Sequence, residues 1–191
     1  MHYKELNQTL GNVDIYLLDQ ILKGRFESKP RILDAGCGEG RNLSYFKNNG
    51  HIIYGIDKNP LAIRMLHMMY KVLPKEHFLA GDLETLPWKD NFFDAIVCSA
   101  VLHFAPDQTS MYTMVSEMVR VLKPRGTLFI RAASDLGLSS PQDSNFSYLI
   151  TKHDIEKIQE IFPVVSVEPV KSVLVEDKRS MLVWVLEKTG L

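Results

Sequence analysis

Short apolar runs alternate along the chain with longer segments in which apolar residues recur every three or four positions. The short runs have the length of buried strands, whereas the longer segments have the spacing of helices that bury one face. The pattern predicts strands over residues 31–35, 51–56, 77–80, 93–100 and 127–132, and helices over 13–22, 41–49, 61–73 and 109–122. Strands and helices therefore alternate as repeated βα units, which are typical of a parallel sheet.

The pattern changes after the fifth predicted strand. Residues 134–147 are rich in Ser, Asp, Gly, Pro and Asn, and loops longer than about 12 residues are usually functional or disordered. Thr151 is placed to cap a helix that runs to residue 161. Two β-rich segments follow, 164–175 and 181–187, and the short charged junction between them predicts an antiparallel hairpin.

These elements define a fold class. Five strands that alternate with helices imply right-handed crossovers and a parallel sheet covered on both faces. We therefore predict an α/β fold, a Rossmann-like doubly wound sheet that is mostly parallel and ends in a C-terminal antiparallel hairpin. Sheets of this kind bind ligands outside the carboxyl ends of their strands, so we expect the functional residues just after the first four strands.

A glycine-rich turn follows the first predicted strand. The segment ILDAGCGEGRN, residues 32–42, has three glycines at alternating positions, which let the backbone approach a ligand closely. A tight βα turn without a ligand is the simpler alternative. A dinucleotide fingerprint would need a small residue where Arg41 stands, and Glu39 places a negative charge where a pyrophosphate would rest. The loop therefore suits a ligand without phosphates.

Composition narrows the function further. The chain has 22 Lys plus Arg against 23 Asp plus Glu, giving a formal net charge of −1, so a broad basic face for nucleic acid is not expected. The first residues lack the features of a signal peptide, and the longest apolar run, 95–105, is far shorter than the roughly 20 residues that cross a bilayer. We expect a cytoplasmic protein that does not bind membranes. The two cysteines and the scattered histidines have no metal-ligand spacing, so no metal is expected.

Five motifs stand in a characteristic order: DAGCGEG after the first strand, Asp57 at the end of the second, GDLETLPW after the third, FDAIVCSAVLHF through the fourth, and VLKPRGTLFI into the fifth. In this order they resemble the class I S-adenosylmethionine-dependent methyltransferases over residues 32–130, and the first two also resemble the tellurite-resistance and thiopurine methyltransferases. The resemblance implies the class I methyltransferase fold and S-adenosylmethionine as cofactor. It also implies a single domain, 1–191, with an N-terminal helical lid (1–30), a cofactor-binding core (31–133), a substrate-side loop (134–150) and a helix plus terminal hairpin (151–191).

The resemblance assigns a role to each motif residue. Asp57 would accept hydrogen bonds from both ribose hydroxyls, or else it only neighbours a helix cap. Asp82 would accept from the adenine amino group while the Leu83 amide donates to a ring nitrogen, or else Asp82 is part of an ordinary turn. Asp34 would face the cationic methionine end, and Arg41 would either neutralise the cofactor carboxylate or simply start a helix. The remaining residues of the expected cofactor site are Gly36, Cys37, Gly38, Lys58 and Ser99.

Methyl transfer from a sulfonium needs mainly alignment of donor and acceptor. His103, just after the fourth strand, could take a proton from the acceptor at neutral pH, or it could pack under the following loop. We expect a small-molecule acceptor and a monomer or homodimer. The alternatives are a non-catalytic S-adenosylmethionine-binding or sensor protein, an RNA methyltransferase, and last a nicotinamide oxidoreductase.

Overall fold

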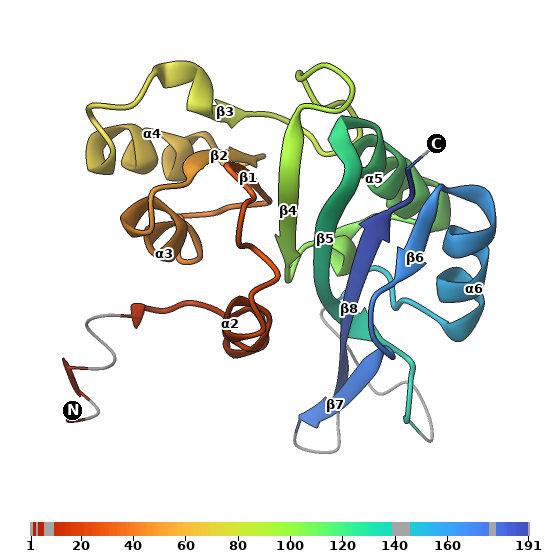
Figure 1. Cartoon of the computed structure of the whole chain (residues 1–191). Coiled ribbons are helices and arrows are strands. Elements are labelled where there is room, and N and C mark those ends of the chain that lie inside the picture. The colour runs from red at the N-terminus through yellow and green to blue at the C-terminus, as the bar shows by residue number, and fades with distance from the viewer. Residues whose placement is uncertain (1, 3, 6–9, 139–145, 176–178, 191) are drawn as a thin grey trace.

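The computed structural model describes residues 2, 4–5, 10–138, 146–175 and 179–190. The described residues form one eight-stranded sheet in the order β3-β2-β1-β4-β5-β8-β6, with β7 paired to β8 (Figure 1). The parallel strands are β1 (Arg31–Ala35), β2 (Ile52–Asp57), β3 (Phe78–Ala80), β4 (Phe93–Ser99) and β5 (Leu122–Ser134). The antiparallel strands are β6 (Val164–Ser166), β7 (Lys171–Val175) and β8 (Arg179–Lys188). The predicted fold class is therefore confirmed.

Helices cover both faces of the sheet. They are α2 (Ile15–Leu22), α3 (Leu43–Asn48), α4 (Pro60–Met69), α5 (Gln108–Val121) and α6 (Lys152–Ile161), with single 3-10 turns at Lys75–His77 and Leu102–Phe104. One apolar core joins α2, α3 and α4 to the sheet, and includes Leu17, Phe46, Leu66 and Phe129. The other joins α5 and α6 to the opposite face. No helix among the described residues is long and apolar enough to cross a bilayer.

Local sequence signals set several helix ends. The Asn59 side chain caps α4 by accepting from the Leu61 N–H, and Pro60 occupies the first helical position. Thr151 and Asp154 form a capping box at the start of α6. By contrast, α3 starts at Leu43 and α4 ends at Met69, so the predicted helices 41–49 and 61–73 are too long.

Two strand predictions need correction. The predicted run 164–175 is divided into β6 and β7, which pair with different parts of β8. Pro169 lies between them and has no N–H to donate to a sheet. The predicted strand 127–132 is too short, because β5 begins at Leu122 and includes residues 124–126, where the pairing register shifts and Arg125 adopts a φ of 60°. Part of the predicted loop, residues 139–145, lies outside the described residues, but Ser147 and Tyr148 donate backbone hydrogen bonds to the His103 carbonyl.

Candidate functional site

The glycine-rich loop folds around the end of β2. The N–H groups of Gly36 and Cys37 donate to the Ile56 carbonyl at 2.8 and 3.0 Å, and the Gly38 N–H donates to Asp57 Oδ2 at 2.8 Å. Gly36 has a φ of +77°, and a Cβ on it would lie 2.3 Å from Val101 Cγ2. Glycine is therefore required at position 36 by both backbone conformation and space.

A cavity of about 310 Å³ opens beside this loop. The ends of β1, β2 and β4, and the segments that follow β3 and β4, supply its walls, as the topology of a parallel sheet predicts. Its lining residues are Gly36, Asp57, Lys58, Gly81, Leu83, Ala100, Val101, Phe104 and Met114. The sequence-predicted residues Gly36, Asp57, Lys58 and Leu83 are thus brought together at one cavity.

Asp57 presents two partly satisfied oxygens to this cavity. Oδ2 accepts from the Gly38 N–H and Oδ1 accepts from the Asn59 N–H, each at 2.8 Å. A carboxylate oxygen has two lone pairs, so each oxygen retains acceptor capacity after its backbone hydrogen bond. The backbone hydrogen bonds also fix the orientation of the carboxylate, which suits it to accept from two neighbouring hydroxyl groups.

Asp82 is held by Lys58 in this structure. Lys58 Nζ lies 2.9 Å from Asp82 Oδ2, and the Glu84 N–H donates to Oδ1 at 3.0 Å. Burial acts to raise the pKa of Asp82, but the hydrogen bonds from Lys58 and from the Glu84 N–H outweigh it and hold the pKa below its usual value. Asp82 therefore stays ionised at neutral pH and can accept a hydrogen bond from an amino group.

A second cavity, of about 420 Å³, adjoins the first and shares Gly36 and Ala100 with it. Its other lining residues are Cys37, Gly38, Glu39, Arg41, Asn42 and Ser99. Ala100 has a φ of 64°, an uncommon conformation for a residue with a Cβ. It directly follows β4 and lines both cavities. Arg41, Ser99 and Cys37 therefore lie with the glycine loop, as the sequence predicts.

Asp34 carries an unsatisfied buried oxygen. Asp34 lies in β1, two residues before Gly36, and only 2% of its surface is exposed. Its Oδ2 has no hydrogen-bond partner among the described residues. Burial raises its pKa to about 7; the Arg41 charge opposes this rise, and the Asp57 charge adds to it. A buried carboxylate without a partner is costly. Asp34, like Asp82, is not among the residues that line either cavity.

An ionic network that the sequence analysis missed supports the second cavity. The side chain of Asp14, completely buried, lies between Arg131 Nη1 at 2.7 Å and Arg41 Nη2 at 3.5 Å. The Ser99 hydroxyl donates to Asp14 Oδ2 at 3.0 Å and accepts from Arg41 at 3.1 Å. Asp14 also caps α2, so the network ties this helix to the ends of β4 and β5.

Part of this network has a sequence signal. An aspartate directly before an apolar helical segment indicates a helix cap, and this would have identified Asp14. Its partner Arg131 is 117 positions away, and nothing in a single sequence pairs the two.

His103 is buried and lines neither cavity. Its Nδ1 accepts a hydrogen bond from the Ala133 N–H at 3.0 Å, which places the proton of the neutral ring on Nε2. Burial, with help from the charges of Arg131 and Arg179, lowers its pKa to about 4. Both nitrogens are thus poorly suited to accept a proton. The geometry favours the alternative interpretation, in which His103 packs under the following loop.

The two cysteines are buried and unreactive. Burial raises the pKa of the Cys37 and Cys98 thiols, so neither is an activated nucleophile. Among the described residues no group of three or more His, Cys, Asp or Glu side chains could hold a metal ion.

Comparison with known proteins agrees with this geometry. Residues 33–130 match the family described as Methyltransferase domain. Over 135 residues the chain is 28% identical to malonyl-[acyl-carrier protein] O-methyltransferase of Enterobacter lignolyticus, covering 70% of this chain and 50% of that protein. It is 34% identical over 103 residues to phthiotriol/phenolphthiotriol dimycocerosates methyltransferase of Mycobacterium leprae, covering 53% of this chain and 37% of the relative. The chain thus spans half or less of the length of these relatives.

Solved structures share the fold. A crystal structure of a SAM-dependent methyltransferase from Methanosarcina mazei superposes with a TM-score of 0.72 at 19% identity, covering 90% of this chain and 98% of the other. The N-methyltransferase NodS from Bradyrhizobium japonicum gives a TM-score of 0.67 at 21% identity, covering 90% of this chain and 94% of the other. The ordered motifs, the paired cavities and the family match together place this chain among the class I S-adenosylmethionine-dependent methyltransferases.

Proposed function

We propose that this chain binds S-adenosylmethionine in the two adjoining cavities and transfers its methyl group to a small-molecule acceptor. The observation that carries the proposal is the pair of Asp57 oxygens, each fixed by one backbone N–H and each able to accept a further hydrogen bond at the cavity wall. A vicinal diol such as a ribose satisfies both oxygens at once. When bound, the cofactor supplies a methyl group on a sulfonium, which is already a good leaving group.

Other residues that line the cavities or lie next to lining residues fit the rest of the cofactor. The side chains of Leu83 and Val101 offer apolar surface for the adenine ring, and ionised Asp82 can accept from its amino group after releasing Lys58. The partnerless Oδ2 of Asp34 suits the cationic amino group at the methionine end. Arg41, which lines the second cavity and is half exposed, suits the carboxylate. Each group of the cofactor thus has a partner of opposite or complementary character.

We propose that the protein promotes the reaction by aligning the acceptor with the methyl group, and that His103 does not act as a base. The imidazole is buried, its Nδ1 is already hydrogen-bonded, and its pKa is about 4. Alignment alone can lower a barrier by several kcal/mol, provided the nucleophile is held in line with the bond that breaks. Relatives named for malonyl-[acyl-carrier protein] and for phthiotriol/phenolphthiotriol dimycocerosates agree with an acceptor that is not a nucleic acid, whereas a relative from Arabidopsis thaliana, 33% identical over 101 residues, is named for a tRNA. The chain's net charge of −1 points the same way.

The direct test uses S-adenosylmethionine labelled in the methyl group, incubated with a panel of small carboxylates, phenols, thiols and lipids. The proposal expects label in at least one acceptor, and no transfer by Asp57→Ala. The buried His103 favours a second candidate, a protein that binds the cofactor without transferring the methyl group. Saturable cofactor binding without transfer to any member of the panel would support that candidate and overturn methyl transfer to such acceptors.

A further inference from the structure

The outward side of α4 is apolar, which is unusual for a surface helix. Leu61, Met65, Met68 and Met69 on the helix, and Val72 just after it, have exposed fractions between 41% and 90%. We name these five residues the α4 ridge. Surface helices normally present polar residues to water, and contiguous exposed apolar residues mark interaction sites. The helix lies at the outer end of the sheet, beside the edge strand β3 (Figure 1).

A groove of about 500 Å³ lies next to the α4 ridge, between α4 and β3. Ile63, Phe78 and Leu79 supply apolar lining, and Arg64 and Lys75 also line the groove. The edge of β3 is partly covered, because His67 Nε2 lies 2.9 Å from the carbonyl oxygen of Phe78. A carbonyl can only accept, so the imidazole donates to it and reduces the capacity of β3 to pair with an added strand. The groove is therefore suited to side chains and not to a new strand.

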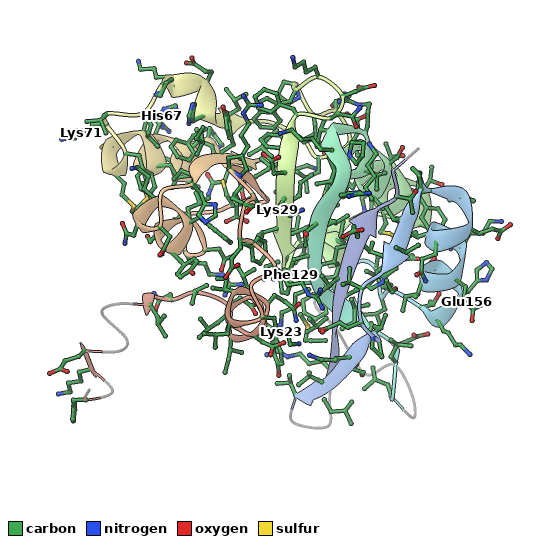
Figure 2. All side chains as sticks on the ribbon, in the orientation of Figure 1. Lys23, Lys29, His67, Lys71, Phe129 and Glu156 are labelled. Atoms are coloured by element: carbon green, nitrogen blue, oxygen red, sulfur yellow. The ribbon has the colours of Figure 1, made fainter. Side chains whose placement is uncertain are left out.

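The surroundings of the α4 ridge are cationic. Residues 60–76 contain Arg64, Lys71 and Lys75 and one acidic residue, Glu76, although the whole chain has a net charge of −1. Within the described part of the chain, no ion pair joins any of these three cations to a carboxylate. Lys71 and His67 are labelled at this end of the molecule (Figure 2). The surface thus combines an apolar stripe with unpaired positive charges.

We propose that the α4 ridge and its groove dock an acidic amphipathic helix of a partner protein. Leucines and other aliphatic residues on one face of such a helix would pack on the α4 ridge, and its acidic residues would form ion pairs with Arg64, Lys71 and Lys75. Methionine side chains adapt to the shape of a partner, as at other helix-binding surfaces. The proposal does not depend on the reaction at the cofactor site.

Two other occupants fit the surface less well. A second copy of this chain, related by a two-fold axis, would bring the same cations against one another. A membrane would contact the α4 ridge but leave the groove unfilled, and the α4 ridge has none of the Trp or Phe residues that anchor interfacial helices. Shape and charge together therefore favour a protein helix.

The test follows methionine methyl signals by NMR in the full chain. The probe is a synthetic helical peptide with leucines along one face and glutamates along the other, and the control peptide carries lysines in place of the glutamates. We expect the acidic peptide alone to shift the signals of Met65, Met68 and Met69, while those of the buried Met111 and Met118 stay in place. Binding should weaken as salt is added.

Variants locate the contact. Met68→Glu places a charge on the apolar α4 ridge, and the double variant Arg64→Glu/Lys71→Glu reverses two of the positive charges. Each should weaken binding of the acidic peptide at least about tenfold. Ile161→Glu, at an exposed apolar position on α6, is the matched control and should bind normally. The proposal is overturned if the acidic peptide does not bind, if the lysine peptide binds equally well, or if dilution alone shifts the α4 ridge signals. The proposal is also overturned if the chain binds vesicles that contain phosphatidylserine more tightly than it binds the acidic peptide.

Discussion

Replacing Gly36 by alanine tests how the glycine loop is built. The change introduces a Cβ at a φ of +77°, 2.3 and 2.8 Å from the two methyl carbons of Val101. The left-handed backbone conformation costs about 1–2 kcal/mol for a residue with a Cβ. Overpacking of this kind costs a further ~1–3 kcal/mol, since valine rotates little about χ1. We therefore expect Gly36→Ala to lower the free energy of unfolding by roughly 2–5 kcal/mol.

Two further variants separate the contributions of conformation and packing. Gly38 also has a positive φ, of +49°, but a Cβ there would meet no atom within 4 Å. Gly38→Ala should therefore lose only the conformational part, about 1–2 kcal/mol. In a Val101→Ala background, Gly36→Ala should cost about 1–3 kcal/mol less than in the native chain, because the clashing methyl groups are gone.

Urea denaturation with linear extrapolation measures each free energy of unfolding, and calorimetry measures the affinity for S-adenosylmethionine. Because Val101 lines the first cavity, beside the glycine loop, Gly36→Ala should also weaken cofactor binding, and Val101→Ala should partly restore it. Equal losses of stability in Gly36→Ala and Gly38→Ala, or no coupling between positions 36 and 101, would refute this account of the loop.

Three further predictions concern buried polar groups. Asp34→Asn should raise the stability of the cofactor-free chain by about 1–3 kcal/mol above pH 7 and weaken cofactor binding. The Asp34 carboxyl has a pKa of 3.8 in the unfolded chain and about 7 in the folded chain, so the native protein loses stability as pH rises between these values, and the asparagine variant does not. Thermal melts across pH check this, and a pH profile that the variant leaves unchanged would contradict it. His103→Asn should keep methyl transfer, whereas His103→Leu should cost about 1–3 kcal/mol by leaving the Ala133 N–H unpaired; loss of transfer at full stability in both would instead indicate a base. The native chain should also lose stability as pH falls from about 6.5 to about 4, where His103 is protonated more readily in the unfolded chain, and His103→Asn should lose less. Asp14→Ala should cost about 3–5 kcal/mol by leaving Arg131 without its buried partner, and Asp14→Asn should cost less because asparagine also caps helices; equal losses by urea denaturation would show that the charge contributes nothing.

Much of the fold follows from the sequence because its signals are local. The apolar runs of β1, β2 and β4 predict buried strands, and Asn59-Pro60 marks the start of α4 through capping chemistry. The boundaries that the pattern misplaced depend on distant contacts. Residues 124–126 read locally as a turn, yet pairing with β4 keeps them in β5 as an irregularity.

The candidate site was predictable where it depends on the ends of parallel strands. Gly36, Asp57 and Leu83 come together because the topology brings those ends to one edge of the sheet. The ion pair between Asp14 and Arg131 was not predictable, because it depends on how α2 packs over β5. The role expected for His103 depended on its position in the chain, but burial and the Ala133 N–H set its proton affinity.

The affinity of Asp57→Ala for S-adenosylmethionine tests the central claim most directly. Two hydrogen bonds to an ionised carboxylate contribute about 1.5–3 kcal/mol each, so the account predicts binding at least about 100-fold weaker than in the native chain, measured by calorimetry. Asp94→Asn is the matched control, because Asp94 lies at the opposite end of β4, where it pairs with Lys123; it should bind normally. Unchanged affinity in a folded Asp57→Ala variant would contradict the assignment of the cofactor site.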